Sequence, residues 1–141
     1  MSEYLGKNLV IFFYKSNFGA KTPQEMNYLM ERYEVFDKMK TKVAFCSPDK
    51  PFNHTIFAGK LRQLYGNECL KDMVILSDGS REIGQRYGVA EAGDTGANPK
   101  YLKGLIIIDK QGVLRYSKII DSVSDRIATE VVTFIESNLC N

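Results

Sequence analysis

The 141-residue sequence has little of what marks several large classes of protein. Its three cysteines are too few for a disulfide scaffold, and none forms the C-x-x-C pair of a cysteine-rich zinc site. Its formal charge is only +2, from 19 Lys and Arg against 17 Asp and Glu, so charge indicates neither a nucleic-acid nor a membrane partner. Because no repeat or low-complexity linker divides the chain, we expect one domain over residues 1–141. We also expect neither a cofactor nor a metal ion.

Long apolar segments are also missing. The first apolar run, over residues 9–13, is far shorter than the ~20 residues of a membrane span and lacks the flanks of a signal peptide. Cys140 lies one residue from the end, so the terminus is not a prenylation box. We therefore expect a soluble, cytoplasmic protein in a reducing environment.

The sequence does contain short apolar runs that alternate with stretches of helical spacing. The apolar runs are rich in β-branched and aromatic residues and predict five strands, over residues 9–14, 43–46, 73–76, 105–108 and 113–116. The last two strands are predicted to form a hairpin. The stretches with helical spacing predict four helices: 23–40, 53–64 (with Ile56, Leu61 and Leu64 facing inward), 80–87 (ended by Gly88) and 124–137. Residues 89–100 lack periodicity and indicate an irregular loop.

This order predicts an α/β fold. Right-handed crossovers make the first three strands parallel, and the terminal hairpin adds an antiparallel pair. We expect a thioredoxin-like sandwich, in which helices flank a five-stranded mixed sheet.

The most informative point is the loop that leads from the first strand to the long helix. Ligands of open α/β sheets bind outside the carboxyl ends of the parallel strands, and a helix start attracts anions and lowers the pKa of a thiol. Here Thr22 is predicted to cap the helix, Pro23 suits its first position and Glu25 completes a capping box. Two interpretations stay open for Lys15, Lys21 and Lys103: they converge near the cap and hold an anion, or they form solvated surface.

Several segments resemble, in order, the motifs of the peroxiredoxin family of the alkyl hydroperoxide reductase and thiol-specific antioxidant type. Residues 12–25 are similar to the active-site motif Phe-Tyr-Pro-x-x-Phe-Thr-x-x-Cys-Pro-x-Glu, although Lys15 stands where that motif has its first Pro. Further segments resemble the family's Ser-Val-Asp, its Phe-Ser-His-x-x-Trp and its later blocks: 47–49, 52–57, 76–78, 87–89, 103–109 and 112–115. The resemblance covers about residues 5–136 and implies a thioredoxin-like fold and thiol-dependent reduction of hydroperoxides.

The departures from the family pattern fall on the residues that the resemblance makes catalytic. Thr22 stands at the position of the peroxidatic cysteine, Gly19 at that of the helper Thr and Lys103 at that of the Arg, whereas Pro23 and Glu25 match. An alcohol neither ionises like a thiol nor passes through a sulfenic state. We therefore expect a catalytically impaired or inactive member that acts in redox homeostasis or through protein interaction.

Two alternatives remain open at this stage. The first is an active thiol peroxidase with a relocated cysteine, for which Cys46 is the best candidate, although a buried packing role also fits this residue. The second is a thioredoxin-like adaptor, which is weakened by the missing C-x-x-C and by the distance of Pro99 from its strand. Cys69 and Cys140 are expected in a loop and a frayed tail, and His54 in a capping or packing role.

The predicted partners follow from the same two sources. Strand 113–120 is expected at a sheet edge, and the resemblance implies that it pairs in a homodimer. A hydroperoxide or a small anion is expected near residues 15–23.

Overall fold

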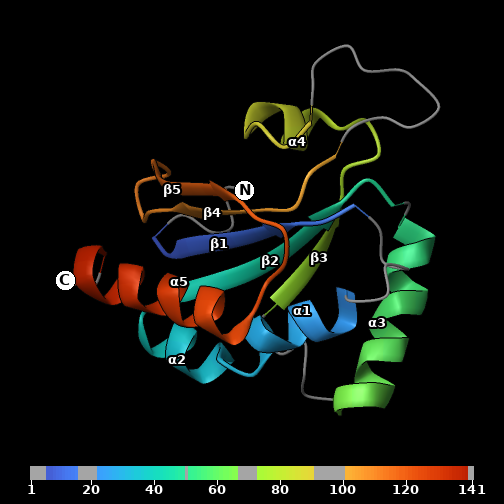
Figure 1. The fold of residues 1–141 in the computed structure, drawn as a ribbon, viewed down its shortest axis with the longest axis horizontal. Helices are drawn as coiled ribbons and strands as arrows, with labels where there is room; N and C mark the ends of the chain where they lie inside the picture. The colour runs from blue at the N-terminus through green and yellow to red at the C-terminus, as the bar shows by residue number, and fades with distance from the viewer. Residues whose placement is uncertain (1–5, 16–21, 50, 67–72, 91–100, 140–141) are drawn as a thin grey trace.

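One five-stranded mixed sheet organises the protein, in the order β3-β2-β1-β4-β5 (Figure 1). The computed structural model describes residues 6–15, 22–49, 51–66, 73–90 and 101–139. β1 pairs in parallel with β2, and β2 with β3, whereas β4 is antiparallel to both β1 and β5. The strands are β1 (Asn8–Phe13), β2 (Thr41–Ser47), β3 (Met73–Ser77), β4 (Gly104–Ile108) and β5 (Leu114–Ile119). The predicted α/β architecture is confirmed.

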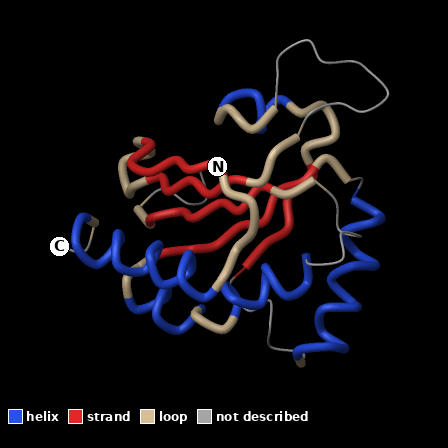
Figure 2. Tube along the Cα trace, in the orientation of Figure 1, coloured by secondary structure: helices blue, strands red, loops and turns tan. Residues whose placement is uncertain are grey.

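The helices form layers on the two faces of this sheet (Figures 1 and 2). One face is covered by α1, α2 and α5, the other by α4, and α3 lies at the β3 side. The helices are α1 (Thr22–Met30), α2 (Tyr33–Lys38), α3 (Pro51–Tyr65), α4 (Glu82–Arg86) and α5 (Asp125–Asn138). No helix of the described residues is long and apolar enough to cross a membrane.

The central strand β1 is buried at all six positions because both of its faces are covered. Val10, Phe12 and Tyr14 point to the core beneath α1, α2 and α5, whereas Ile11 and Phe13 point to a smaller core beneath α4. Alternate side chains of a strand project to opposite faces, so a continuous apolar run fits only a strand covered on both.

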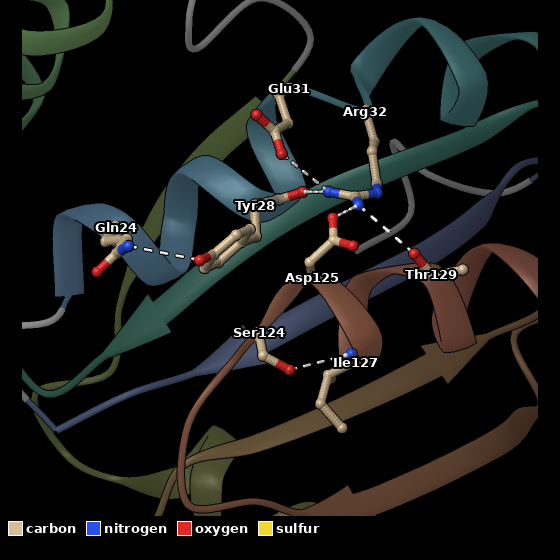
Figure 3. A network of polar contacts seen from close by, with 8 residues as sticks. All are labelled: Gln24, Tyr28, Glu31, Arg32, Ser124, Asp125, Ile127 and Thr129. Carbon is tan, nitrogen blue, oxygen red and sulfur yellow. Dashed lines mark hydrogen bonds and ion pairs between the residues drawn. The ribbon is translucent and has the colours of Figure 1, made fainter.

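The helix predicted over 23–40 is instead two helices, because the chain turns at Glu31 and Arg32. The amide of Arg32 donates to Leu29 O (3.1 Å), whereas Tyr28 O accepts from the guanidinium of Arg32 (2.5 Å). Arg32 also bonds Asp125 in the first turn of α5 (Figure 3). The guanidinium thus competes for a helical carbonyl and fixes the break where α5 docks.

The predicted inner face of α3 was wrong at two positions. Ile56 and Leu64 are 50% and 56% exposed, and only Leu61 of the predicted residues is buried. The buried face carries His54, Phe57 and Leu61, at i, i+3 and i+7. Apolar residues occur on both sides of this helix, so the sequence alone did not identify the buried side.

The remaining elements lie close to their predicted bounds. The hairpin turn is closed by the Gly112 amide donating to Asp109 O (2.9 Å), with Gly112 at φ +85°. Helix α5 begins after Ser124, whose Oγ accepts from Ile127 N (3.3 Å). Helix α4 is shorter than expected, although Gly88 follows it in the left-handed conformation as predicted.

Some predictions concern residues outside the described ranges. They include the sites at Gly19 and Lys21, the environments of Cys69 and Cys140, and most of the loop predicted over 89–100. These predictions, and the single domain over 1–141, remain predictions.

Candidate functional site

Thr22 is the first residue of α1 and is 3% exposed. The structure thus counts it within the helix, whereas the sequence predicted it as the preceding cap. Pro23 follows at the second position, where its missing N–H needs no helical partner. Thr22 is therefore an enclosed threonine at the start of a helix, and its place at the position of the peroxidatic cysteine remains a prediction from the family resemblance.

Glu25 joins three separate parts of the chain. Its Oε1 accepts from Lys103 Nζ (2.8 Å), and its Oε2 accepts from the amide of Val123 (2.9 Å). The carboxylate is 2% exposed and the lysine side chain 28%. Both carboxylate oxygens of Glu25 thus bond partners far from the helix start, and the predicted capping box with Thr22 remains a prediction.

This pairing also bears on the predicted cluster of lysines. The ammonium of Lys103 faces a carboxylate, so its charge is matched within the protein. Lys15 is exposed, and Lys21 lies outside the described residues. The idea of an anion held near residues 15–23 remains a prediction.

Cys46 lies near the carboxyl end of β2 and is 0% exposed. Its Sγ lies 3.6 Å from the Oη of Tyr101. Burial raises the pKa of the thiol to about 12, so the folded protein holds it protonated near neutral pH. A protonated, enclosed thiol is a poor nucleophile, since the thiolate is the reactive form.

Tyr101 and Asp78 complete the environment of Cys46, and the sequence did not single out either side chain. Tyr101 Oη donates to Asp78 Oδ2 (3.0 Å), and burial raises the pKa of Tyr101. Asp78 belonged to a recognised motif, but Tyr101 directly follows the stretch without periodicity and has no sequence signal.

A second polar cluster lies at the carboxyl ends of β1, β2 and β3. Ser47 Oγ donates to Asp49 Oδ2 (3.1 Å), and Ser77 Oγ donates to the carbonyl oxygen of Asp49 (2.5 Å). The pKa of Tyr14 is raised by burial, and a hydrogen bond with Ser47 partly offsets this. Burial lowers the pKa of His54, against the opposing effect of Asp49. The bonds of Asp49 fasten the loop after β2 to the ends of β2 and β3.

Within the described residues, no group of three or more His, Cys, Asp or Glu side chains is placed to hold a metal ion.

Comparison with known proteins agrees with the observed fold. Residues 1–117 match the AhpC/TSA family. A putative peroxiredoxin ycf42 of Trieres chinensis is 34% identical over 138 residues, which are 97% of this chain and 65% of that protein. Peroxiredoxin-4 of Rattus norvegicus is 32% identical over 139 residues, 97% of this chain and 48% of that protein. The chain belongs to the AhpC/TSA, or peroxiredoxin, family.

Solved structures show the same fold at low identity. Plasmodium yoelii thioredoxin peroxidase I superposes with a TM-score of 0.77 at 23% identity, covering 97% of this chain and 76% of that one. The bacterioferritin comigratory protein of Xanthomonas campestris superposes with a TM-score of 0.81 at 17% identity, covering 97% and 82%. The chain spans about half to two thirds of the length of the first curated relatives it matches.

Proposed function

We propose that this protein is a peroxiredoxin-family member that does not reduce hydroperoxides at the start of α1 and acts by binding or assembly in redox homeostasis. The observation that carries the proposal is the enclosed Thr22 at the family's nucleophile position. An alcohol there supplies neither the thiolate that attacks the O–O bond nor a sulfur that accepts the oxygen.

The neighbouring positions support the same proposal. By the family resemblance, an Arg at position 103 would act on the peroxide. The shorter Lys103 presents a single ammonium in place of a planar fork of five donors, and Glu25 engages that ammonium. Pro23 and Glu25 therefore keep a structural task at the helix start, and the activating groups are missing.

The alternative of a relocated peroxidatic cysteine at Cys46 has the geometry against it. A peroxide must reach Sγ, and the attacking species must be the thiolate. Full burial and a pKa of about 12 oppose both requirements. The second alternative, a thioredoxin-like adaptor, has the same fold and would be one form of the action by binding that we propose.

Peroxide consumption and intact mass, followed together, test this proposal. The fully reduced protein is mixed with one equivalent of hydrogen peroxide, and Cys46→Ser is run beside it as the matched variant. We expect slow peroxide loss, as for an ordinary thiol, and no fast addition of oxygen to either protein. Fast oxidation that is lost in Cys46→Ser would establish the relocated cysteine, and fast oxidation retained there would place the chemistry at another cysteine; both refute the proposal.

We also propose a homodimer in which two copies pair along β5. The strand is at the edge of the sheet, and Leu114 and Ile119 are about half exposed on it. A groove of about 590 Å³ lies between Tyr116 of β5 and the outer side of α5, and it adds a surface beside that edge. An unpaired edge of this kind favours strand addition.

Light scattering at tens of micromolar tests the dimer. We expect a dimer for the native protein, a monomer for Leu114→Lys and a dimer for the control Val35→Lys, whose site is exposed on α2. A native monomer, or a Leu114→Lys dimer, would exclude pairing through β5. The cytoplasmic location remains a prediction.

A further inference from the structure

Among the described residues, Cys46 belongs to the smaller core, which lies on the face of the sheet covered by α4 and opposite α1, α2 and α5 (Figure 1). The described cover of this core consists of α4, residues 89–90 and Tyr101. An antiparallel bridge joins Ala90 to Tyr101, and Leu102 N donates to Val89 O (2.8 Å). The chain that leaves α4 and the chain that returns to β4 are therefore bonded to each other.

A chain of buried hydrogen bonds connects this cover to the sheet. Cys46, Tyr101 and Asp78 are 0%, 4% and 3% exposed, and their polar atoms follow one another at 3.6 and 3.0 Å. The phenol has one proton and donates it to the Asp78 carboxylate, so the contact with Cys46 requires the thiol as donor. The order of donation is Cys46 to Tyr101 to Asp78.

The same carboxylate holds the start of α4. Asp78 accepts from the amides of Ile83 (3.0 Å) and Gly84 (2.8 Å). The residue before the helix, Arg81, has φ +64°, a costly conformation for a residue with a side chain. The bonds to Asp78 offset that cost. The Asp78 carboxylate therefore holds both the start of α4 and the hydroxyl group of Tyr101.

Helix α4 and the ring of Tyr101 also touch directly. A Cβ placed on Gly84 would lie 2.7 Å from Cε2 of Tyr101, closer than real Cβ atoms come. The ring therefore lies against the helix backbone, and it also packs on Phe13 with centroids 6.3 Å apart. If the Tyr101 ring moved away from α4, the contacts between ring and helix would break. If the ring and the helix move away from the sheet together, these contacts remain.

We propose that α4, residues 89–90 and Tyr101 open from the sheet as one unit, held closed by the Cys46–Tyr101–Asp78 latch, and that Cys46 reacts with solutes only in the open state. An adduct on Sγ removes the thiol proton and occupies the space beneath Tyr101, so modification holds the unit open. The device does not depend on whether the protein consumes peroxide.

Iodoacetamide labelling of Cys46 tests the latch, with peptide-resolved mass spectrometry to separate this thiol from the other two. The reagent forms an Sγ–C bond with loss of iodide, and a rate proportional to its concentration reports the open population. Tyr101→Phe keeps the ring and removes both bonds. The control Tyr87→Phe removes a hydroxyl from a ring that packs on the same Phe13, with centroids 6.1 Å apart.

We expect Tyr101→Phe to raise the Cys46 labelling rate roughly tenfold, the factor for loss of about one net hydrogen bond, and Tyr87→Phe to change it less than twofold. The native rate should also vary little with urea well below the unfolding transition, because opening is local. Equal rates in the two variants, or a native rate that follows the urea dependence of global unfolding, would overturn the proposal.

A measurement on the native protein covers the case in which Tyr101→Phe does not fold. The amides of Ile83 and Gly84 lose their bonds to Asp78 when the unit opens. The factor by which the fold slows their hydrogen exchange should therefore agree, within about threefold, with the factor by which it slows the labelling of Cys46. Amides that exchange at least tenfold more readily than Cys46 is labelled would show that α4 opens without exposing the thiol, and would overturn the proposal.

Discussion

The Glu25–Lys103 pair offers the sharpest test of how the start of α1 is held. The perturbation is a double-mutant cycle of Glu25→Gln, Lys103→Met and their combination. Glu25→Gln keeps an acceptor for the Val123 amide and removes the charge. Lys103→Met keeps much of the apolar stem and leaves a carboxylate that is 2% exposed without its cation.

The expected magnitude follows from the geometry of the pair. At 2.8 Å and an effective dielectric constant of about 20, the gross attraction is about 6 kcal/mol. Desolvation of the buried carboxylate offsets much of it, and the partial exposure of Lys103 screens it further. A net coupling of about 2 kcal/mol, typical of a hydrogen bond between charged groups, remains.

Urea unfolding followed by circular dichroism measures this coupling. With a slope of about 2 kcal/mol per molar, we expect Lys103→Met to lower the midpoint by about 1 M. The control Lys118→Met breaks the Lys118–Glu130 pair, in which both side chains are about 40% exposed, and should cost less than about 1 kcal/mol. Costs that add within about 0.5 kcal/mol in the cycle would refute the claim that the pair fastens α1.

Three further predictions concern other parts of the molecule. Arg32→Met should lower the free energy of unfolding by about 1–2 kcal/mol, because it releases bonds to Tyr28 and Asp125, whereas Arg62→Met at an exposed site of α3 should change it by less than 0.5 kcal/mol; equal effects in urea titrations would contradict this. Burial lowers the pKa of His54 from its usual 6.5, so the unfolded chain binds a proton before the fold does, and the free energy of unfolding should fall as the pH drops through the usual range of an imidazole. Urea midpoints between pH 7.5 and 5 measure this decline, and an equal decline in His54→Gln would exclude the imidazole as its source. Thr22→Cys alone should restore little peroxidase activity, because Gly19 and Lys103 remain; peroxide loss at rates typical of the family would show that these two positions matter less than argued.

Local patterns in the sequence predicted most of the fold. A continuous apolar run such as that of β1 identifies a strand covered on both faces. Asp109 and Gly112 are residue types typical of a tight hairpin turn, so this turn was also predictable. The buried side of α3 was not predictable, because Phe52 and Ile56 mark an apolar stripe on the exposed side as well. Periodicity identifies an apolar face but not the layer that covers it.

The candidate site was predictable only where local chemistry defines it. The position of Thr22 at a helix start follows from the adjacent Pro23. The role of Glu25 does not, because one of its partners, Val123, is 98 residues away in the chain. The contact between Cys46 and Tyr101 spans 55 residues and has no pattern in either segment. Long-range polar contacts of buried groups are set by the packed fold, so they become visible only with it.

The central claim is the proposal that this family member does not reduce hydroperoxides, because Thr22 stands at the predicted position of the peroxidatic cysteine and no other cysteine takes over its role. Stopped-flow peroxide consumption by the fully reduced native protein, with the intact mass recorded at each time point, tests it most directly. The account predicts loss no faster than that of an unactivated thiol and no single-site oxygen adduct at early times. Rapid loss of one equivalent of peroxide, with one oxygen added or one disulfide formed, would contradict it.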